Sequence, residues 1–445
     1  MLRALPVRRP TVIGLVALLL AGAPAAWADA ALDAAVVAIE PKVVAWRRDI
    51  HQHPELGNRE FRTSALVAEH LKGLGIEVKT GVAHTGVVGT LVGGRPGPVI
   101  ALRADMDALP VAERVDLPYA SKVRSTYAGQ EVGVMHACGH DAHVAILMGV
   151  AEILSQRRET IPGTIKFFFQ PAEEGPPPGE EGGAELMVKE GVMENPKVDA
   201  VFGLHINSRI ETGHIGYRPG GAMASRDTFR IVLTGKQSHG ASPWQGVDPI
   251  VTAAQVVMGL QTIVSRNVEL TEGAAVVSVG RISGGVRSNI IPEQVELEGT
   301  LRALTSETKE LLRQRVRAVA TEIAGAMGAS AEVILPSEPS YPVTYNDPDL
   351  TARMLPSLQR AAGADKVFVR PAVTGSEDFS FFAQEAPGLF IFLGGRDPAI
   401  PAVEAPDHHT PDFRIDDRGL DLGVKVMAQL ALDYLSGASH TATQP

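Results

Sequence analysis

The sequence predicts a two-domain α/β protein in which a small α+β domain is inserted into a larger, discontinuous α/β domain. Predicted helices and strands alternate along most of the chain, which indicates a layered α/β fold. Between about residues 222 and 335 the order becomes strand-helix-strand-strand-helix-strand, the ferredoxin-like order (βαββαβ). A chain of 445 residues also exceeds what one hydrophobic core usually supports.

The elements of the larger domain come from both ends of the chain. Apolar residues that recur every three or four positions predict helices, and short apolar runs between turn residues predict strands. The run PVIALRADMD is almost continuously apolar, as in strands that are buried on both faces. The predicted helices span 32–55, 61–75, 143–157, 350–363 and 418–437, and the predicted strands span 87–94, 98–107, 163–171, 198–206 and 388–395.

The inserted domain has its own set of elements. Its predicted strands span 227–236, 274–285, 293–303 and 330–339, and its predicted helices span 248–266 and 306–328. We therefore expect residues 29–221 and 336–445 to form the larger domain, and residues 222–335 to form the inserted one.

Residues 1–28 are typical of a secretory signal peptide. Arg3, Arg8 and Arg9 precede an apolar run, and AWADA offers a small-x-small cleavage site after Ala28. We therefore expect a secreted or periplasmic protein without a membrane segment after cleavage. An uncleaved anchor is the alternative, although the run is shorter than the about 20 apolar residues that span a bilayer. The adjacent residues Arg8 and Arg9 are compatible with twin-arginine export, so the pattern does not decide between this route and the general secretory route.

The charge balance and the cysteine content limit the possible functions. The chain has 41 basic and 51 acidic residues and a net charge of −10. Nucleic-acid binding depends largely on neutralising phosphate, so an acidic chain argues against such a partner. Cys138 is the only cysteine, which excludes an internal disulfide. It is either a small buried apolar residue or a metal ligand.

Residues that can bind metals or transfer protons follow predicted strands or begin helices at four places. The carboxyl ends of strands in an open α/β sheet meet at one edge, so loops from distant parts of the chain can converge there. The four stretches are HACGHDAH with Cys138 and His140, FFFQPAEEG with Glu173 and Glu174, VFGLHI with His205, and DHHTPDF with His408 and His409.

Three local patterns suggest how these residues act. Residues two apart in an extended loop project to the same side, so Cys138 and His140 can share a zinc-like ion. Adjacent residues point to opposite faces, so one of Glu173 and Glu174 can bind metal while the other serves as general base. A solvated acidic loop is the alternative for this pair. Asp107 can orient a ligand imidazole, or it can cap a turn.

The motifs RADMDALP, HACGHDAH, QPAEEG, GLH, GKQSHGASPWQGVDPI, SNIIPEQVELEGTLR, GSEDFSFF and HTPDF follow one another across the chain. Together they resemble the family of N-acyl-amino-acid amidohydrolases and hippurate hydrolases. That family includes the plant auxin-conjugate amidohydrolases and is related to the aminoacylase and carboxypeptidase G metallopeptidases. The resemblance implies a di-metal, exopeptidase-like catalytic domain and an inserted lid domain through which the chain forms a homodimer.

The resemblance also implies a metal centre. Two divalent ions per subunit are expected, zinc or manganese, with cobalt or nickel as alternatives. Their implied ligands are Cys138, His140, Glu174, His205 and His409. His408 competes with His409, but the motif position directly before Thr410 favours His409.

Other residues acquire roles through the same resemblance. Glu173 becomes the general base, and His239 reaches towards the reacting amide, often across the dimer in such enzymes. Asn289 and Arg302 match positions that hold the substrate carboxylate, whereas an exposed charge on an edge strand is the alternative for Arg302. Three acidic residues shape the site from behind the ligands: Asp107, Glu377 and Asp378.

These implied roles describe an exported, metal-dependent amidohydrolase. Its substrates are small N-acyl or N-aroyl amino acids, which metal-activated water and Glu173 cleave to a carboxylic acid and a free amino acid. A periplasmic dipeptidase or carboxypeptidase that cleaves short peptides is one alternative. A non-catalytic relative that binds a metal or a ligand is the other.

Overall fold

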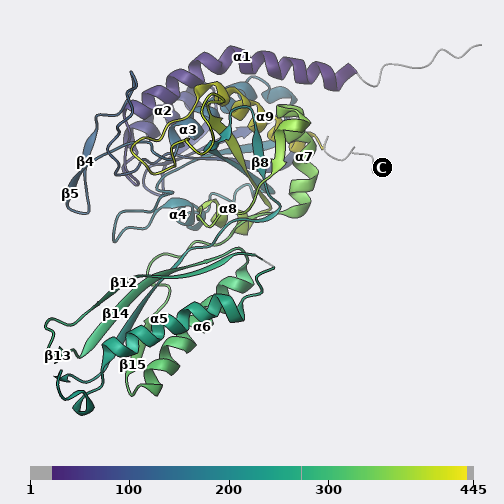
Figure 1. Cartoon of the computed structure of the whole chain (residues 1–445). Helices are drawn as coiled ribbons and strands as arrows, with labels where there is room; N and C mark the ends of the chain where they lie inside the picture. Colours follow the sequence, from purple (N-terminus) through teal and green to yellow (C-terminus); the bar gives the residue numbers. More distant parts are fainter. Residues whose placement is uncertain (1–22, 272, 438–445) are drawn as a thin grey trace, which may run out of the picture.

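The computed structural model describes residues 23–271 and 273–437, which form two parts (Figure 1). The part that we call the body contains the elements α1 to β9 and β16 to α9. The part that we call the lid contains the elements β10 to β15, which lie between the two halves of the body in sequence. This arrangement confirms the predicted fold class, while the domain boundaries at residues 222 and 335 stay predictions.

The body is built on a mixed eight-stranded sheet. Its strand order is β1-β2-β6-β3-β7-β18-β8-β17, and the central pairs β6-β3, β3-β7 and β7-β18 are parallel. The strands are β1 (Glu77–Val82), β2 (Gly86–Val92), β3 (Arg95–Asp105), β6 (Pro162–Gln170), β7 (Ala200–Glu211), β8 (Ile215–Tyr217), β17 (Val367–Val369) and β18 (Gly388–Arg396).

Helices cover both faces of this sheet. Strand β6 shows why: Phe167 and Phe169 pack into one hydrophobic core and Phe168 into another, because adjacent residues of a strand point to opposite faces. The first core is closed by α1 (Ala23–Gln52), α2 (Phe61–Gly73), α3 (His140–Ser155), α7 (Pro348–Ala362) and α9 (Leu420–Ser436). The second core is closed by α4 (Gly183–Lys189) and α8 (Phe379–Glu385).

The helices differ in how deeply they are buried. Helix α3 is apolar on nearly all sides and lies almost wholly inside the body, which fixes the histidines in its first turn. Helices α4 and α8 lie on the side of the body that faces the lid (Figure 1). None of the described helices is both long enough and apolar enough to cross a bilayer.

The lid has the predicted ferredoxin-like order. Its antiparallel sheet runs β12-β14-β10-β15, and two helices cover one face around a separate core. The other face carries no helix, and β12 forms one edge of the sheet. The elements are β10 (Asp227–Thr234), α5 (Pro249–Asn267), β12 (Ala275–Gly284), β14 (Gln294–Ala303), α6 (Ser306–Ala326) and β15 (Ser330–Ile334).

The two connections between body and lid run side by side. Strand β9 (Gly220–Met223) pairs with β16 (Thr344–Asn346), and the pairing continues into the lid through two backbone hydrogen bonds. The Arg226 N–H donates to the Tyr341 carbonyl at 3.0 Å, and the Tyr341 N–H donates to the Arg226 carbonyl at 2.9 Å. The body and the lid therefore meet at a narrow, paired joint.

Two small two-stranded sheets stand apart from the main sheets. One joins β4 (Arg124–Tyr127) to β5 (Gln130–Gly133) in the body. The other joins β11 (Ser238–His239) to β13 (Ile290–Ile291), at the end of the lid that is farthest from the body (Figure 1).

Candidate metal centre

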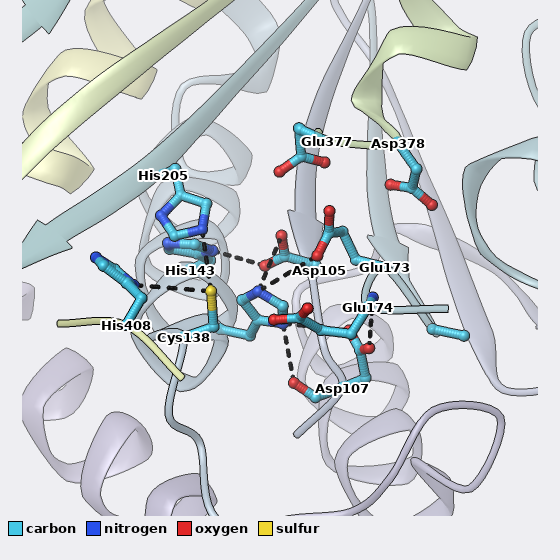
Figure 2. Close-up of polar contacts among 12 residues, drawn as sticks. Asp105, Asp107, Cys138, His143, Glu173, Glu174, His205, Glu377, Asp378 and His408 are labelled. Carbon is cyan, nitrogen blue, oxygen red and sulfur yellow. Dashed lines mark hydrogen bonds and ion pairs between the residues drawn. The ribbon is translucent and has the colours of Figure 1, made fainter. Parts of the chain in front are cut away.

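Side chains from separate segments converge on one point beside the body sheet (Figure 2). The segments are the end of β3, the start of α3, the loop after β6, the middle of β7, and the loop that contains residues 408 and 409. The four stretches that sequence analysis selected therefore lie together, as strand topology predicts.

Cys138 lies at the middle of this cluster. Its Sγ lies 3.3 Å from His205 Nε2 and 3.3 Å from His409 Nε2. These separations are close to the about 3.5 Å expected for a sulfur and a nitrogen that bind one zinc ion tetrahedrally. Burial, followed by the nearby Glu174 carboxylate, raises the pKa of the thiol. A cation is therefore needed to stabilise the thiolate in this position.

Two groups of donor atoms share Cys138. The first contains Cys138, His140 and His205, and the second contains Cys138, Glu174 and His409, with the donors of each group lying within 4.8 Å of one another. In the second group His409 Nε2 lies 2.9 Å from Glu174 Oε1. The chemistry of these donors fits two divalent ions, one of which would be held by each group.

The rings of His140 and His205 are oriented as metal ligands are. His140 Nδ1 lies 2.9 Å from the Asp107 carbonyl and 3.2 Å from Asp107 Oδ1, and its buried Nε2 has no hydrogen-bond partner. His205 Nδ1 lies 2.6 Å from the Ile206 carbonyl. Each Nδ1 therefore donates its proton, which leaves the Nε2 lone pair free for a metal.

Asp107 connects the two donor groups. One carboxylate oxygen contacts the His140 ring, and the other accepts a hydrogen bond from the Glu174 N–H at 3.0 Å. One buried side chain thus positions a donor of each group, which is the orienting role that the sequence suggested for Asp107.

Two further histidines, His143 and His408, lack a free and correctly placed nitrogen. His143 Nδ1 lies 2.6 Å from Asp105 Oδ1, and its Nε2 accepts the Ile206 N–H at 2.8 Å. His408 Nε2 accepts the Ser208 N–H at 3.2 Å, so its Nδ1 carries the proton and faces the Cys138 sulfur at 3.7 Å. The geometry therefore favours His409 over His408 as a ligand.

Glu173 lies on the inner side of the cluster, against a second group of carboxylates. Its Oε2 lies 3.9 Å from His140 Nε2. Carboxylate oxygens of Glu173, Glu377 and Asp378 lie within 4.8 Å of one another. Burial and then the Glu377 charge raise the pKa of Glu173 well above its usual range. Glu173 is thus placed to hold a proton beside the two donor groups.

Arg103 compensates the buried negative charge behind the cluster. This fully buried guanidinium contacts Asp105 Oδ2 at 2.7 Å, Glu377 Oε1 at 2.7 Å and Asp378 Oδ1 at 2.9 Å. Asp105 in turn holds the His143 ring, so the arginine links the histidine side of the cluster to the carboxylate side. Sequence analysis missed this role, although an arginine inside an apolar strand was a signal.

The lid residues chosen from the sequence fall into two sets. Arg302 lies at the joint, where its Nη1 donates to Ser376 Oγ at 3.1 Å, next to Glu377. His239 lies in β11 and Asn289 directly precedes β13, in the two-stranded sheet at the far end of the lid, so the chain does not bring them to its own cluster (Figure 1). Tyr341, which sequence analysis missed, donates from its hydroxyl to the Glu173 carbonyl at 3.0 Å.

Comparisons with known proteins show the family of the chain. Residues 101–433 match the family described as peptidase family M20/M25/M40. The chain is 41% identical to thermostable carboxypeptidase 2 of Saccharolobus solfataricus, over 89% of this chain and 96% of that protein. It is 38% identical to N-acetyl-L-cysteine deacetylase of Bacillus subtilis, over 86% of this chain and 85% of that protein. A solved dinuclear metal-binding M20 peptidase from Bacillus subtilis is 35% identical, with a TM-score of 0.75, over 90% of this chain and 99% of that one.

These relatives correct one prediction and confirm others. The resemblance and the expectation of a metal-dependent hydrolase are confirmed. The prediction of a secreted or periplasmic protein is wrong, because relatives such as the Bacillus subtilis deacetylase are cytoplasmic enzymes. Most of the proposed signal peptide lies outside the described residues. The proposed cleavage position after Ala28 lies within α1.

Replacing Arg103 with Met tests the charge compensation. Asp105, Glu377 and Asp378 then lose their buried cation, so the free energy of unfolding should fall by about 3–5 kcal/mol in chemical denaturation. Arg124→Met is the matched control, because Arg124 forms an exposed ion pair with Glu131. Removing such a pair costs about 0–1 kcal/mol. Equal losses in the two variants would contradict this role for Arg103.

Alanine variants of the two adjacent histidines test the ligand set. We expect the zinc content after dialysis to fall from about two ions per chain to about one in His409→Ala, because a donor of the second group is lost. His408→Ala should keep about two ions, since His408 only donates a proton to the sulfur. The measurement is metal content by mass spectrometry. A larger loss in His408→Ala would reverse the assignment.

Proposed function

The chain belongs to peptidase family M20/M25/M40, and we propose that it hydrolyses the amide bond of N-acyl amino acids to a carboxylic acid and a free amino acid. Family membership makes it a metal-dependent hydrolase of amide or peptide bonds. The observation that carries the proposal is Cys138, which belongs to two donor groups that have the buried Glu173 carboxylate beside them. Such a centre suits water-dependent cleavage of an amide.

The proposed ligands divide into two sets of three that share the sulfur. One ion would be held by Cys138, His140 and His205, and the other by Cys138, Glu174 and His409. Zinc or manganese fits these mixed sulfur, nitrogen and oxygen donors, with cobalt or nickel as alternatives. When bound, the ions supply Lewis acidity to the water and to the amide carbonyl.

Glu173 moves the proton in the proposed reaction. It takes a proton from water as the water oxygen bonds to the amide carbonyl carbon, and it returns that proton to the nitrogen as the carbon–nitrogen bond breaks. Tyr341 fixes the Glu173 backbone from the lid joint. Arg103 holds Glu377 and Asp378 in place, and these two residues limit the movement of the Glu173 carboxylate on its inner side. These residues keep Glu173 in one position through both proton transfers.

The lid supplies the proposed substrate contacts. Arg302 at the joint would pair with the carboxylate of the amino-acid moiety, as a guanidinium fork does with two oxygens. His239 and Asn289 lie at the far end of the lid and would act on the centre of a second chain. This division of the site requires a homodimer.

The proposed dimer forms through the edge of the lid. Strand β12 is an unpaired edge, and a groove of about 430 Å³ lies between it and α5. Its lining is mostly apolar, and exposed Met258 (67%) and Ile282 (55%) project there. An apolar edge strand of this length is a template for pairing with a second copy. The lining residues are Ala254, Val257, Met258, Val279, Gly280, Arg281 and Ile282.

A carboxypeptidase is the second candidate function. One relative at 41% identity carries that name, whereas another at 38% is named a deacetylase of N-acetyl-L-cysteine. The two functions differ in whether the cleaved moiety carries a free α-amino group. A panel of N-acetyl and N-benzoyl amino acids beside plain dipeptides, with zinc or manganese added, separates them. Turnover of the acylated compounds supports the proposal, and turnover of dipeptides alone supports the carboxypeptidase.

Replacing Glu173 with Gln tests the general base. The change removes the proton acceptor but keeps the shape of the side chain, so kcat should fall about 10²- to 10⁴-fold. Metal content should stay unchanged, since Glu173 is not in the proposed ligand set. The control is Glu181→Gln, in the exposed loop that follows, where the Glu181 carboxylate contacts Lys189 and the contacts of Asn58 and His84 are to the Glu181 backbone carbonyl. Full activity of Glu173→Gln would refute the assignment.

A charge in the apolar groove tests the dimer. We expect Ile282→Glu to convert a dimer into a monomer of 47.1 kDa by light scattering, because the new carboxylate loses its water in the interface. kcat should fall at least about 10-fold, since His239 then reaches no second centre. Val403→Glu, at an 88% exposed position of the body, is the control and should change neither property. A monomeric, active wild-type protein would contradict the prediction.

A further inference from the structure

Two arginines face each other across the lid sheet at its joint with the body. Strands β10 and β14 pair Asp227 with Leu301, and the Ser225 N–H donates to the Ala303 carbonyl at 2.8 Å. This register puts Arg226 directly opposite Arg302. The neighbours Asp227 and Leu301 are buried under the lid helices, so the two arginines lie on the face that has no helix.

This pair of cations has little compensation among the described residues. Side chains directly opposite each other in an antiparallel pair are close, and like charges there are destabilising. Arg302 donates only to Ser376 Oγ, and burial together with the Arg226 charge lowers the pKa of Arg302. Arg226 lies 3.8 Å from the exposed Glu338 carboxylate, and its buried Nε has no partner.

The neighbouring arginines on the same face are paired. Arg230 Nε donates to Glu296 Oε2 at 2.8 Å, and Arg281 Nη1 donates to Glu298 Oε1 at 2.9 Å. The sheet therefore neutralises its arginines where they lie farther from the body, whereas at the joint Arg226 has only the exposed Glu338 carboxylate at 3.8 Å and Arg302 donates to the Ser376 hydroxyl. Two guanidinium groups that lie together in this way can bind an anion from solution, which would compensate their charges.

Both guanidinium groups lie close to the candidate base. Arg302 donates to Ser376, which directly precedes Glu377. Carboxylate oxygens of Glu377 and Glu173 lie within 4.8 Å of each other. The Arg226 guanidinium stacks 4.8 Å above the Tyr341 ring, and the Tyr341 hydroxyl donates to the Glu173 carbonyl. Each arginine is thus separated from the base region by one or two side chains.

The same face offers room beside the pair. A hollow of about 450 Å³ begins at the next row of the sheet, where Thr228 and Ser278 present hydroxyl groups, while the Thr300 hydroxyl donates to the Asp227 carbonyl at 3.0 Å. A volume of this size admits a small organic moiety, and hydroxyl groups can donate to carboxylate oxygens.

We propose that Arg226 and Arg302 form a subsite for an amino-acid moiety with two carboxylates, so that the preferred substrates are N-acyl derivatives of aspartate or glutamate. Arg302 takes the α-carboxylate, as in the proposed function on which this inference rests, and Arg226 takes the side-chain carboxylate. One planar guanidinium matches one carboxylate through two parallel hydrogen bonds, so two guanidinium groups suit a dicarboxylate.

The test compares N-acetylglutamate with N-acetylglutamine, which has the same shape but a neutral side chain. In the wild-type enzyme kcat/KM should be at least about 30-fold higher for the glutamate derivative, the effect of a desolvated charge pair. Arg226→Gln should lower kcat/KM for N-acetylglutamate at least about 10 times more than it lowers kcat/KM for N-acetylglutamine, so that the preference is largely lost. Arg230→Gln, whose arginine lies on the same strand and face, is the matched control and should keep the preference.

A binding measurement that needs no turnover completes the test. Calorimetry on the metal-free protein should detect glutarate but not butyrate, and Arg226→Gln should weaken glutarate binding about 10-fold or more, whereas Arg230→Gln should not.

The outcomes separate two failures. If neutral N-acetyl amino acids are cleaved as well as acidic ones, or if Arg226→Gln slows both substrates equally, the dicarboxylate subsite is overturned while the amidohydrolase stands. If no acylated amino acid is cleaved by the metal-loaded enzyme, the proposed function fails, and the inference that rests on it fails as well.

Discussion

Arg103 carries a positive charge in the interior of the body, and the arrangement of the metal centre depends on it. Its guanidinium joins Asp105 at the end of β3 to Glu377 and Asp378 before α8. Without this cation, three carboxylates would lie in a low-dielectric space beside Glu173 and the thiol of Cys138, which charge repulsion opposes. The ion pairs therefore fix both the end of a central strand and the start of a helix far along the chain.

A second constraint acts closer to the donor atoms. Asp107 uses one oxygen for the His140 ring and the other for the Glu174 N–H, so the two donor groups cannot move independently. Glu60 also holds the acidic loop, because its carboxylate accepts a hydrogen bond from the N–H of Ala172, the residue before Glu173. Buried acceptors of backbone N–H groups thus hold the acidic loop, which explains how residues in a glycine- and proline-rich segment keep one geometry.

Much of the fold follows from local patterns, and the fine geometry of the site does not. The run of three phenylalanines in β6 and the helix–strand order of the lid can be recognised from the sequence, because periodicity reflects burial. The motifs also brought the right stretches together. Whether a histidine has a free nitrogen depends on backbone partners that are distant in sequence, as for His143 with Ile206 and His408 with Ser208. Spacing along the chain carries no information about these partners.

The narrow joint has a mechanical consequence. From Arg302 near the joint, β14 extends back to Gln294, a distance of about 27 Å at the usual rise of a strand. The lid is therefore a lever whose pivot is the paired segment of Arg226 and Tyr341. A rotation of about 10° about this pivot would displace the far two-stranded sheet by about 5 Å, from the arc length of such an arm, and would hardly move Arg302. In such a rotation the residues at the pivot would keep an almost constant distance from the metal centre, and the residues at the far end of the lid would move the most.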